Sequence, residues 1–94
     1  MKEIVLDGAG WKTEGDFYDA FFEGVGAPRW HGRNLNALND SIGAGGVNRI
    51  EVPYAVRIKG LSAMSDEARE IVGHFAALVR SLKEEGVPVE VSLE

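Results

Sequence analysis

The sequence predicts a small α/β domain, because strand-like and helix-like segments alternate along the chain and capping residues or glycines bound the helices. The segments follow in the order strand, helix, helix, strand, helix, strand, which implies crossovers between neighbouring parallel strands. With 94 residues, 45% of them hydrophobic, the chain can bury one core but cannot divide into two domains. We therefore expect residues 1–94 to form a single domain whose helices cover the sheet in two or three layers.

The chain opens with a strand and a capped helix. Residues 2–6 alternate loosely and stop at the turn pair Asp7-Gly8, whose glycine tolerates a positive φ. Thr13 is typical of a helix N-cap, and Asp16 three residues later forms an imperfect capping box. The helix that begins here is expected to end near residues 24–26.

A second, shorter helix is predicted over residues 34–42. Its apolar residues recur at helical spacing, and they are Leu35, Leu38 and Ile42. Three polar residues fall on roughly the opposite side, and they are Arg33, Asn36 and Asp40. The run 43–46, Gly-Ala-Gly-Gly, is too permissive to continue the helix. One face of this segment is expected to pack and the other to face outward, which is the pattern of a contact surface.

The second half contains a strand, a long helix and a last strand. Residues 49–59 alternate as a strand, with Pro53 expected at a bulge or an unpaired edge position. Ser65 is expected to cap the long helix, and Gly86 to follow its end as the C′ residue. The apolar stripe of this helix consists of Ile71, Val72, Phe75, Leu78, Val79 and Leu82. Residues 87–93 then alternate again as the final strand.

The charge of the chain argues against a nucleic-acid partner. The formal net charge is −5, and ten basic residues are scattered among fifteen acidic ones, whereas phosphate backbones require clustered Lys and Arg. A basic protein is the more natural partner for such a chain. The chain has no cysteine, and its start lacks the long apolar core of a signal peptide, so we expect a cytoplasmic protein. No segment is long and apolar enough to suggest a membrane span, and the chain is expected to be monomeric.

Residues that could support catalysis are sparse. The two histidines, His31 and His74, have no second His, Cys or paired carboxylate at ligand spacing, so neither a metal nor a cofactor is expected. The glycines after position 42 follow a helix instead of opening one, which argues against a phosphate loop. Ser41 is not part of a nucleophile elbow. An enzyme is therefore not expected, and an acid and base pair of His31 and Asp40 is the remaining catalytic alternative.

Residues 30–40 carry a family resemblance. They read Trp30-His31-Gly32-Arg33-Asn34-Leu35-Asn36-Ala37-Leu38-Asn39-Asp40. This run resembles the signature of the barstar family of small bacterial ribonuclease inhibitors, which is an aromatic pair, Gly, a charged residue and Asn-Leu-Asp-Ala-Leu leading to an acid. The resemblance extends over nearly the whole chain, up to Glu84-Glu85-Gly86 and the apolar strand that follows.

The resemblance implies a three-stranded parallel sheet packed with helices, and a protein that occludes the active site of a small secreted ribonuclease. At Asp40 the family projects a carboxylate into the nuclease site in place of the substrate phosphate. Glu85 aligns with a peripheral contact. The implied partner-binding residues are Trp30, His31, Arg33, Asn36, Asn39, Asp40, Gly43, Ala44 and Glu85.

Departures from the family pattern leave an alternative open. Asn36 replaces the family's other helix acid, Asn39 its helix aromatic and Arg33 its common acid, while Ser81 stands where another acid is expected. The contact helix is therefore much less acidic than in the family. The alternative is an immunity or regulatory protein on the same fold that binds a different toxin or an endogenous protein.

Overall fold

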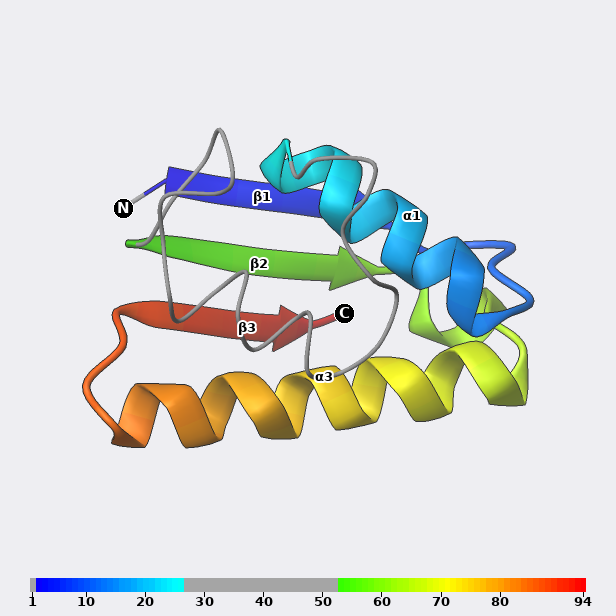
Figure 1. Cartoon of the computed structure of the whole chain (residues 1–94). Coiled ribbons are helices and arrows are strands. Elements are labelled where there is room, and N and C mark those ends of the chain that lie inside the picture. The colour runs from blue at the N-terminus through cyan, green and yellow to red at the C-terminus, as the bar shows by residue number, and fades with distance from the viewer. Residues whose placement is uncertain (1, 27–52) are drawn as a thin grey trace.

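The computed structural model describes residues 2–26 and 53–94. Its elements are β1 (Lys2–Asp7), α1 (Glu14–Val25), β2 (Tyr54–Lys59), the 3₁₀ turn η1 (Leu61–Ala63), α3 (Asp66–Glu84) and β3 (Val89–Leu93), shown in Figure 1. The predicted helix over 34–42 lies outside the described residues, and so do positions 49–52 of the predicted strand.

The three strands form one parallel sheet in the order β1-β2-β3, which confirms the predicted architecture. The register places Ile4 beside Val56 and Val56 beside Val91, so apolar side chains form rows across the sheet. Alternate residues point to opposite faces of a strand, and Ile4 and Leu6 are buried where Val5 is exposed. The sheet therefore has one buried face and one open face.

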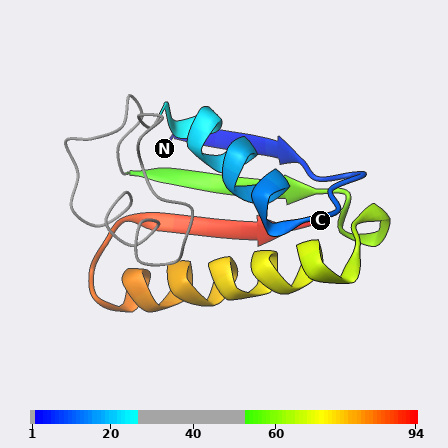
Figure 2. The ribbon, with the colours of Figure 1, turned by 45° about the vertical axis from the view of Figure 1, so that its right-hand side comes forward.

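Both described helices cover the buried face. In Figures 1 and 2, α1 crosses the sheet near β1 while α3 runs beside β3, and the two helices also contact each other. The core between them is aromatic: Phe17 and Phe21 from α1 pack on Phe75 from α3, each with ring centroids 5.1 Å from the Phe75 ring. The described part of the chain thus forms two layers, one of helices and one of sheet.

The helix boundaries follow the predicted caps. The Thr13 hydroxyl accepts the Asp16 N–H, and the Asp16 carboxylate accepts the Thr13 N–H, so the capping box is complete. The Ser65 hydroxyl accepts the Ala68 N–H at 3.1 Å and caps α3. Gly86 follows the end of α3 with φ +96°, as expected for a C′ glycine.

One expectation about the strand over residues 49–59 was wrong in detail. Pro53 lies just before β2 and not within it, because β2 is the central strand and proline cannot donate a ladder hydrogen bond there. In the turn after β1 the positive φ belongs to Gly10, not Gly8. Position 8 instead requires glycine for steric reasons, because a Cβ there would lie 2.9 Å from the Trp11 ring.

A dense hydrogen-bond network joins the elements at the end of the sheet where the strands finish. The Gly8 N–H donates to the Lys59 carbonyl at 2.8 Å, and the Ser65 N–H donates to the Trp11 carbonyl at 3.0 Å. The Glu67 carboxylate of α3 accepts the Glu14 N–H at the start of α1 at 2.9 Å. These bonds tie both helix starts to the strand ends.

Gly60 is expected to be intolerant of any side chain. It has φ +79°, and an added Cβ would lie 2.5 Å from the Ala9 backbone nitrogen. Gly60→Ala should lower the free energy of unfolding by about 1–3 kcal/mol, measured by chemical denaturation. Gly73→Ala is the matched control, because its Cβ would meet nothing within 4 Å inside α3. This control should raise stability by about 0.5–1 kcal/mol. Equal effects of the two changes would contradict the account.

Candidate functional site

The candidate site lies at the end of the sheet where the parallel strands begin. Gly26 at the end of α1 and Pro53 before β2 are both found at this end, together with the turn between α3 and β3 (Figures 1 and 2). The Tyr54 N–H donates to the Pro88 carbonyl at 3.3 Å, which joins the start of β2 to that turn. Residues 27–52 connect Gly26 to Pro53, so both attachment points lie at the end of the described fold that carries Glu85.

Glu85 is the one predicted contact residue that the structure describes. The other eight lie outside the described residues and stay predictions, and they are Trp30, His31, Arg33, Asn36, Asn39, Asp40, Gly43 and Ala44. Glu85 is the C-cap of α3, and its N–H donates to the carbonyls of Ser81 and Leu82. The turn then closes through the Gly86 N–H to Lys83 and the Val87 N–H to Leu82, both at 3.0 Å.

The hydrogen bonds of this turn fix the backbone of Glu85 at the end of α3. Glu85 is exposed, and no ion pair among the described residues involves it. Ser81, one turn earlier on α3, is exposed as well. The end of α3 therefore exposes the Glu85 carboxylate and the Ser81 hydroxyl, near the points where residues 27–52, here named the contact segment, attach to the described fold.

The two described helices direct their C-terminal ends to this same side. The carbonyl end of a helix carries a partial negative charge, which basic residues usually offset. The last turn of α1 has no basic residue and contains the exposed Glu23, while Glu84 and Glu85 follow Lys83 at the end of α3. Helix ends and carboxylates together contribute negative charge to this end of the described fold.

The formal charge of the chain is distributed unevenly between the described fold and the contact segment. Residues 2–26 and 53–94 contain thirteen acidic and seven basic side chains, a net of −6. Residues 27–52 contain two acidic and three basic side chains, a net of +1. The negative charge that predicts a basic partner is therefore carried by residues 2–26 and 53–94, and not by residues 27–52.

Sequence reasoning missed Glu23 and Glu84 as members of this surface. The sequence contains a signal for both residues: acidic residues in the last turn of a helix interact unfavourably with the helix dipole, so their presence there calls for a reason other than stability. Their shared location could not be inferred, since it depends on both helices running against the strand direction (Figure 1). We name Glu23, Glu84 and Glu85 the acidic rim.

The shifted pKa values in the described residues have structural causes. Backbone N–H groups of Lys12 and Thr13 lower the pKa of the capping carboxylate Asp16. The hydrogen bond from Lys83 lowers the pKa of Glu90, and burial raises the pKa of Tyr18. Each shift is explained by a cap, an ion pair or burial.

Neither a metal site nor a membrane-spanning helix is present among the described residues. Within 2–26 and 53–94, no group of three His, Cys, Asp or Glu side chains is placed to hold a metal ion. No helix in these two stretches is both long and apolar enough to cross a bilayer.

The described fold is a small α/β domain with the acidic rim at the end of the sheet where the strands begin. The chain belongs to the barstar family: the family model described as Barstar (barnase inhibitor) matches residues 1–94, the whole chain. No curated protein matches the chain. Members of this family are inhibitors, not enzymes.

Proposed function

We propose that this protein binds a small, basic, secreted bacterial ribonuclease and blocks its active site. The observation that carries the proposal is the family match over residues 1–94. The net charge of −6 on the fold around the contact segment supports it, because ribonuclease active sites concentrate basic side chains to hold RNA phosphates. Such an inhibitor would act in the cytoplasm, where it protects cellular RNA before the nuclease is exported.

The proposed mechanism is occlusion without covalent chemistry. Residues 27–52 would lie against the catalytic cleft, with Asp40 in the place of a substrate phosphate. A desolvated carboxylate makes strong charge-assisted hydrogen bonds with arginine, lysine and protonated histidine. Glu85 would contribute at the periphery, where a solvated ion pair adds little affinity.

Occlusion has a direct kinetic test. If the inhibitor occupies the catalytic cleft, a mononucleotide that binds this cleft should compete with it. We expect the apparent Kd of the inhibitor to rise in proportion to mononucleotide concentration, in titrations that follow the fluorescence of the nuclease. An apparent Kd that does not change at saturating mononucleotide would show that the inhibitor binds elsewhere.

The departures in the contact segment favour a second candidate, an immunity or regulatory protein that recognises another toxin or an endogenous protein. Arg33 and Asn36 are the observations that favour it, since the segment carries a net +1 instead of an acidic helix. Affinity capture from host lysate and from the secreted fraction separates the candidates. A ribonuclease as the captured protein supports the first, and a different toxin or a host protein supports the second.

The acidic rim should accelerate association with a basic nuclease. Glu23→Gln, Glu84→Gln and Glu85→Gln together should lower the association rate constant roughly three- to tenfold at low salt, with little change in dissociation. Stopped-flow fluorescence at several salt concentrations measures both rates, and the variant should show the weaker salt dependence.

The matched control neutralises three acids at the opposite end, Glu14→Gln, Asp66→Asn and Glu70→Gln. These groups lie at the start of their helices, and α3 with its 19 residues is about 28 Å long, well beyond the screening length of about 8 Å at physiological salt. The control should therefore slow association less than the rim variant at physiological salt. Equal slowing would mean that overall charge, not the rim, attracts the partner.

A further inference from the structure

Asp7 and Gly8 form the one Asp-Gly pair of the sequence, which contains no Asn-Gly pair. In such a pair the backbone nitrogen of the glycine can attack the aspartate Cγ, because glycine has no side chain to obstruct the approach. A C–N bond forms, and the carboxyl hydroxyl leaves with the amide proton as one molecule of water. The product is a five-membered succinimide ring. The pair therefore carries a covalent chemistry of its own, separate from binding.

Hydrolysis opens the succinimide at either of its two carbonyls. Water added at the former side-chain carbonyl restores aspartate, whereas water added at the main-chain carbonyl leaves the chain running through the side chain. This second product, isoaspartate, has the mass of aspartate but carries the former Cβ as an extra methylene group in the backbone. One water is lost and one is gained, so no co-reactant is required.

The backbone around Asp7 opposes closure of this ring. Asp7 is the last residue of β1 and pairs with Lys59 of β2, so its backbone is extended. Closure needs the Asp7 Cβ and the Gly8 nitrogen close to eclipsed about the Asp7 Cα–C bond, and an extended residue holds them far apart. The Gly8 N–H also donates to the Lys59 carbonyl at 2.8 Å. The attacking nitrogen is therefore held in the sheet.

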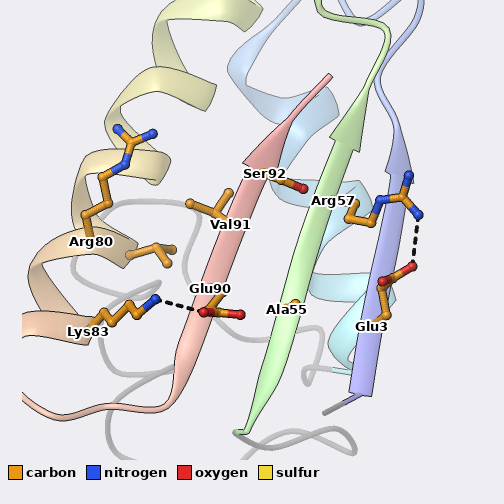
Figure 3. A pocket seen from close by; sticks show the side chains of 9 residues that line it. Glu3, Ala55, Arg57, Arg80, Lys83, Glu90, Val91 and Ser92 are labelled. Atoms are coloured by element: carbon orange, nitrogen blue, oxygen red, sulfur yellow. Dashed lines mark hydrogen bonds and ion pairs between the residues drawn. The ribbon is translucent and has the colours of Figure 1, made fainter.

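The Asp7 carboxylate is likewise held by its own turn. The Ala9 N–H donates to the Asp7 Oδ1 at 3.1 Å. Other carboxylates on the open face of the sheet form ion pairs instead, Glu3 with Arg57 at 3.1 Å and Glu90 with Lys83 at 2.8 Å (Figure 3). Among the described residues, no ion pair draws the Asp7 carboxylate out of the turn, so the Ala9 hydrogen bond sets its position.

The same turn has no room for the extra methylene group of isoaspartate. Gly8 is buried, and even a Cβ added there would overlap Met64 Cε and lie 2.9 Å from the Trp11 ring. The Trp11 N–H donates to the Gly8 carbonyl at 3.0 Å, and the Gly10 N–H donates to the Ala63 carbonyl at 3.2 Å. A longer backbone would displace these groups, so isoaspartate at position 7 does not fit the native turn.

We propose that Asp7 and Gly8 are an isoaspartate site controlled by folding: the native turn prevents succinimide formation, and unfolding permits it. A chain that isomerises while unfolded cannot rebuild the turn between β1 and α1, so it is lost from the native population. Time spent unfolded is thereby recorded in the covalent structure. The proposal does not depend on the ribonuclease partner, because the reaction lies within the chain.

Peptide mapping of the full-length protein tests the protection. Trypsin cleaves after Lys2 and Lys12, so one peptide, residues 3–12, contains the pair. Chromatography separates its isoaspartate form, and electron-transfer fragmentation identifies it. At one temperature and pH, isoaspartate should form at least about tenfold more slowly in the native protein than in urea, because a stable domain is rarely unfolded. A synthetic peptide of residues 3–12 corrects for the effect of urea itself. Equal corrected rates would refute the protection.

Variants outside the turn test whether unfolding controls the reaction. Phe75→Leu should accelerate isomerisation of the native protein by the same factor by which it raises the unfolded fraction, and Gly73→Ala should slow it. Asp7→Glu is the matched chemical control: it keeps the charge, but glutamate would have to close a six-membered ring, so no isomer should accumulate. Rates that ignore the unfolded fraction, or an equal yield of isomer from Asp7→Glu, would overturn the proposal.

Refolding tests the second half of the proposal. Isomerised and unmodified chains from the same urea sample are separated and diluted into native buffer. The unmodified chain should regain the wild-type circular dichroism and unfolding midpoint, whereas the isomerised chain should unfold at a lower urea concentration or show no cooperative transition. An isomerised chain with the wild-type midpoint would mean that the turn accepts the extra methylene group, which contradicts the proposal.

Discussion

Asp40→Ala should weaken binding to the partner nuclease by about 3–5 kcal/mol, roughly a hundred- to several-thousandfold in Kd, because the change leaves buried cations of the nuclease without a counterion. Asp40 is one of only two acidic residues among positions 27–52, so no neighbouring carboxylate in the contact helix can replace it. Isothermal titration calorimetry of wild type and variant against the same nuclease measures the loss.

Two control variants make this prediction specific. Asp40→Asn keeps the size and one acceptor oxygen of the side chain, and should recover only a small part of the lost affinity, since the charge matters most. Glu85→Gln should cost less than about 1 kcal/mol, as expected for an exposed peripheral group. If Asp40→Ala binds as tightly as the wild type, the proposal that its carboxylate replaces a phosphate is wrong.

Phe75→Ala should be the most destabilising single change in the described core. Phe75 is 0% exposed and packs on both Phe17 and Phe21, so it joins α3 to α1. Truncation should lower the free energy of unfolding by about 3–5 kcal/mol through lost burial and the cavity that remains. Much of the stability of so small a domain would be lost.

Phe75→Leu provides the comparison, because leucine fills most of the same space and should cost markedly less than the alanine change. Chemical denaturation followed by circular dichroism measures both variants. At a temperature where both variants remain folded, each should bind the nuclease with nearly the Kd of the wild type. Any small loss of affinity should equal the loss expected from the fraction of unfolded protein. A cost near 1 kcal/mol for Phe75→Ala would mean that the aromatic cluster is less important to the fold than its burial suggests.

Much of the fold could be predicted from local physical signals. The Thr13–Asp16 capping box and Gly86 marked helix ends correctly, because their hydrogen bonds and backbone angles depend on neighbouring residues alone. The apolar stripe of α3 predicted its buried face, and Phe75 and Val79 are fully or almost fully buried. Parallel strands followed from the order of elements.

Other features depend on tertiary arrangement and could not be read from the chain. Pro53 was misplaced because its position relative to the strand depends on β2 being central, a property of the whole sheet. The acidic rim required the relative direction of α1 and α3, and the Lys83–Glu90 pair required the position of α3 beside β3. Of the predicted contact residues, Glu85 is described and exposed, and its contact role stays a prediction like those of the other eight.

The central claim is inhibition, and a titration of the purified protein into RNA-cleavage assays of small secreted bacterial ribonucleases tests it most directly. We expect the activity of one such nuclease to fall linearly to zero at one inhibitor per enzyme, which indicates tight stoichiometric binding. With Asp40→Ala, nuclease activity should remain at this one-to-one ratio. Full RNA cleavage at a tenfold excess of inhibitor across the panel, including any ribonuclease encoded beside the protein, would contradict the proposed function.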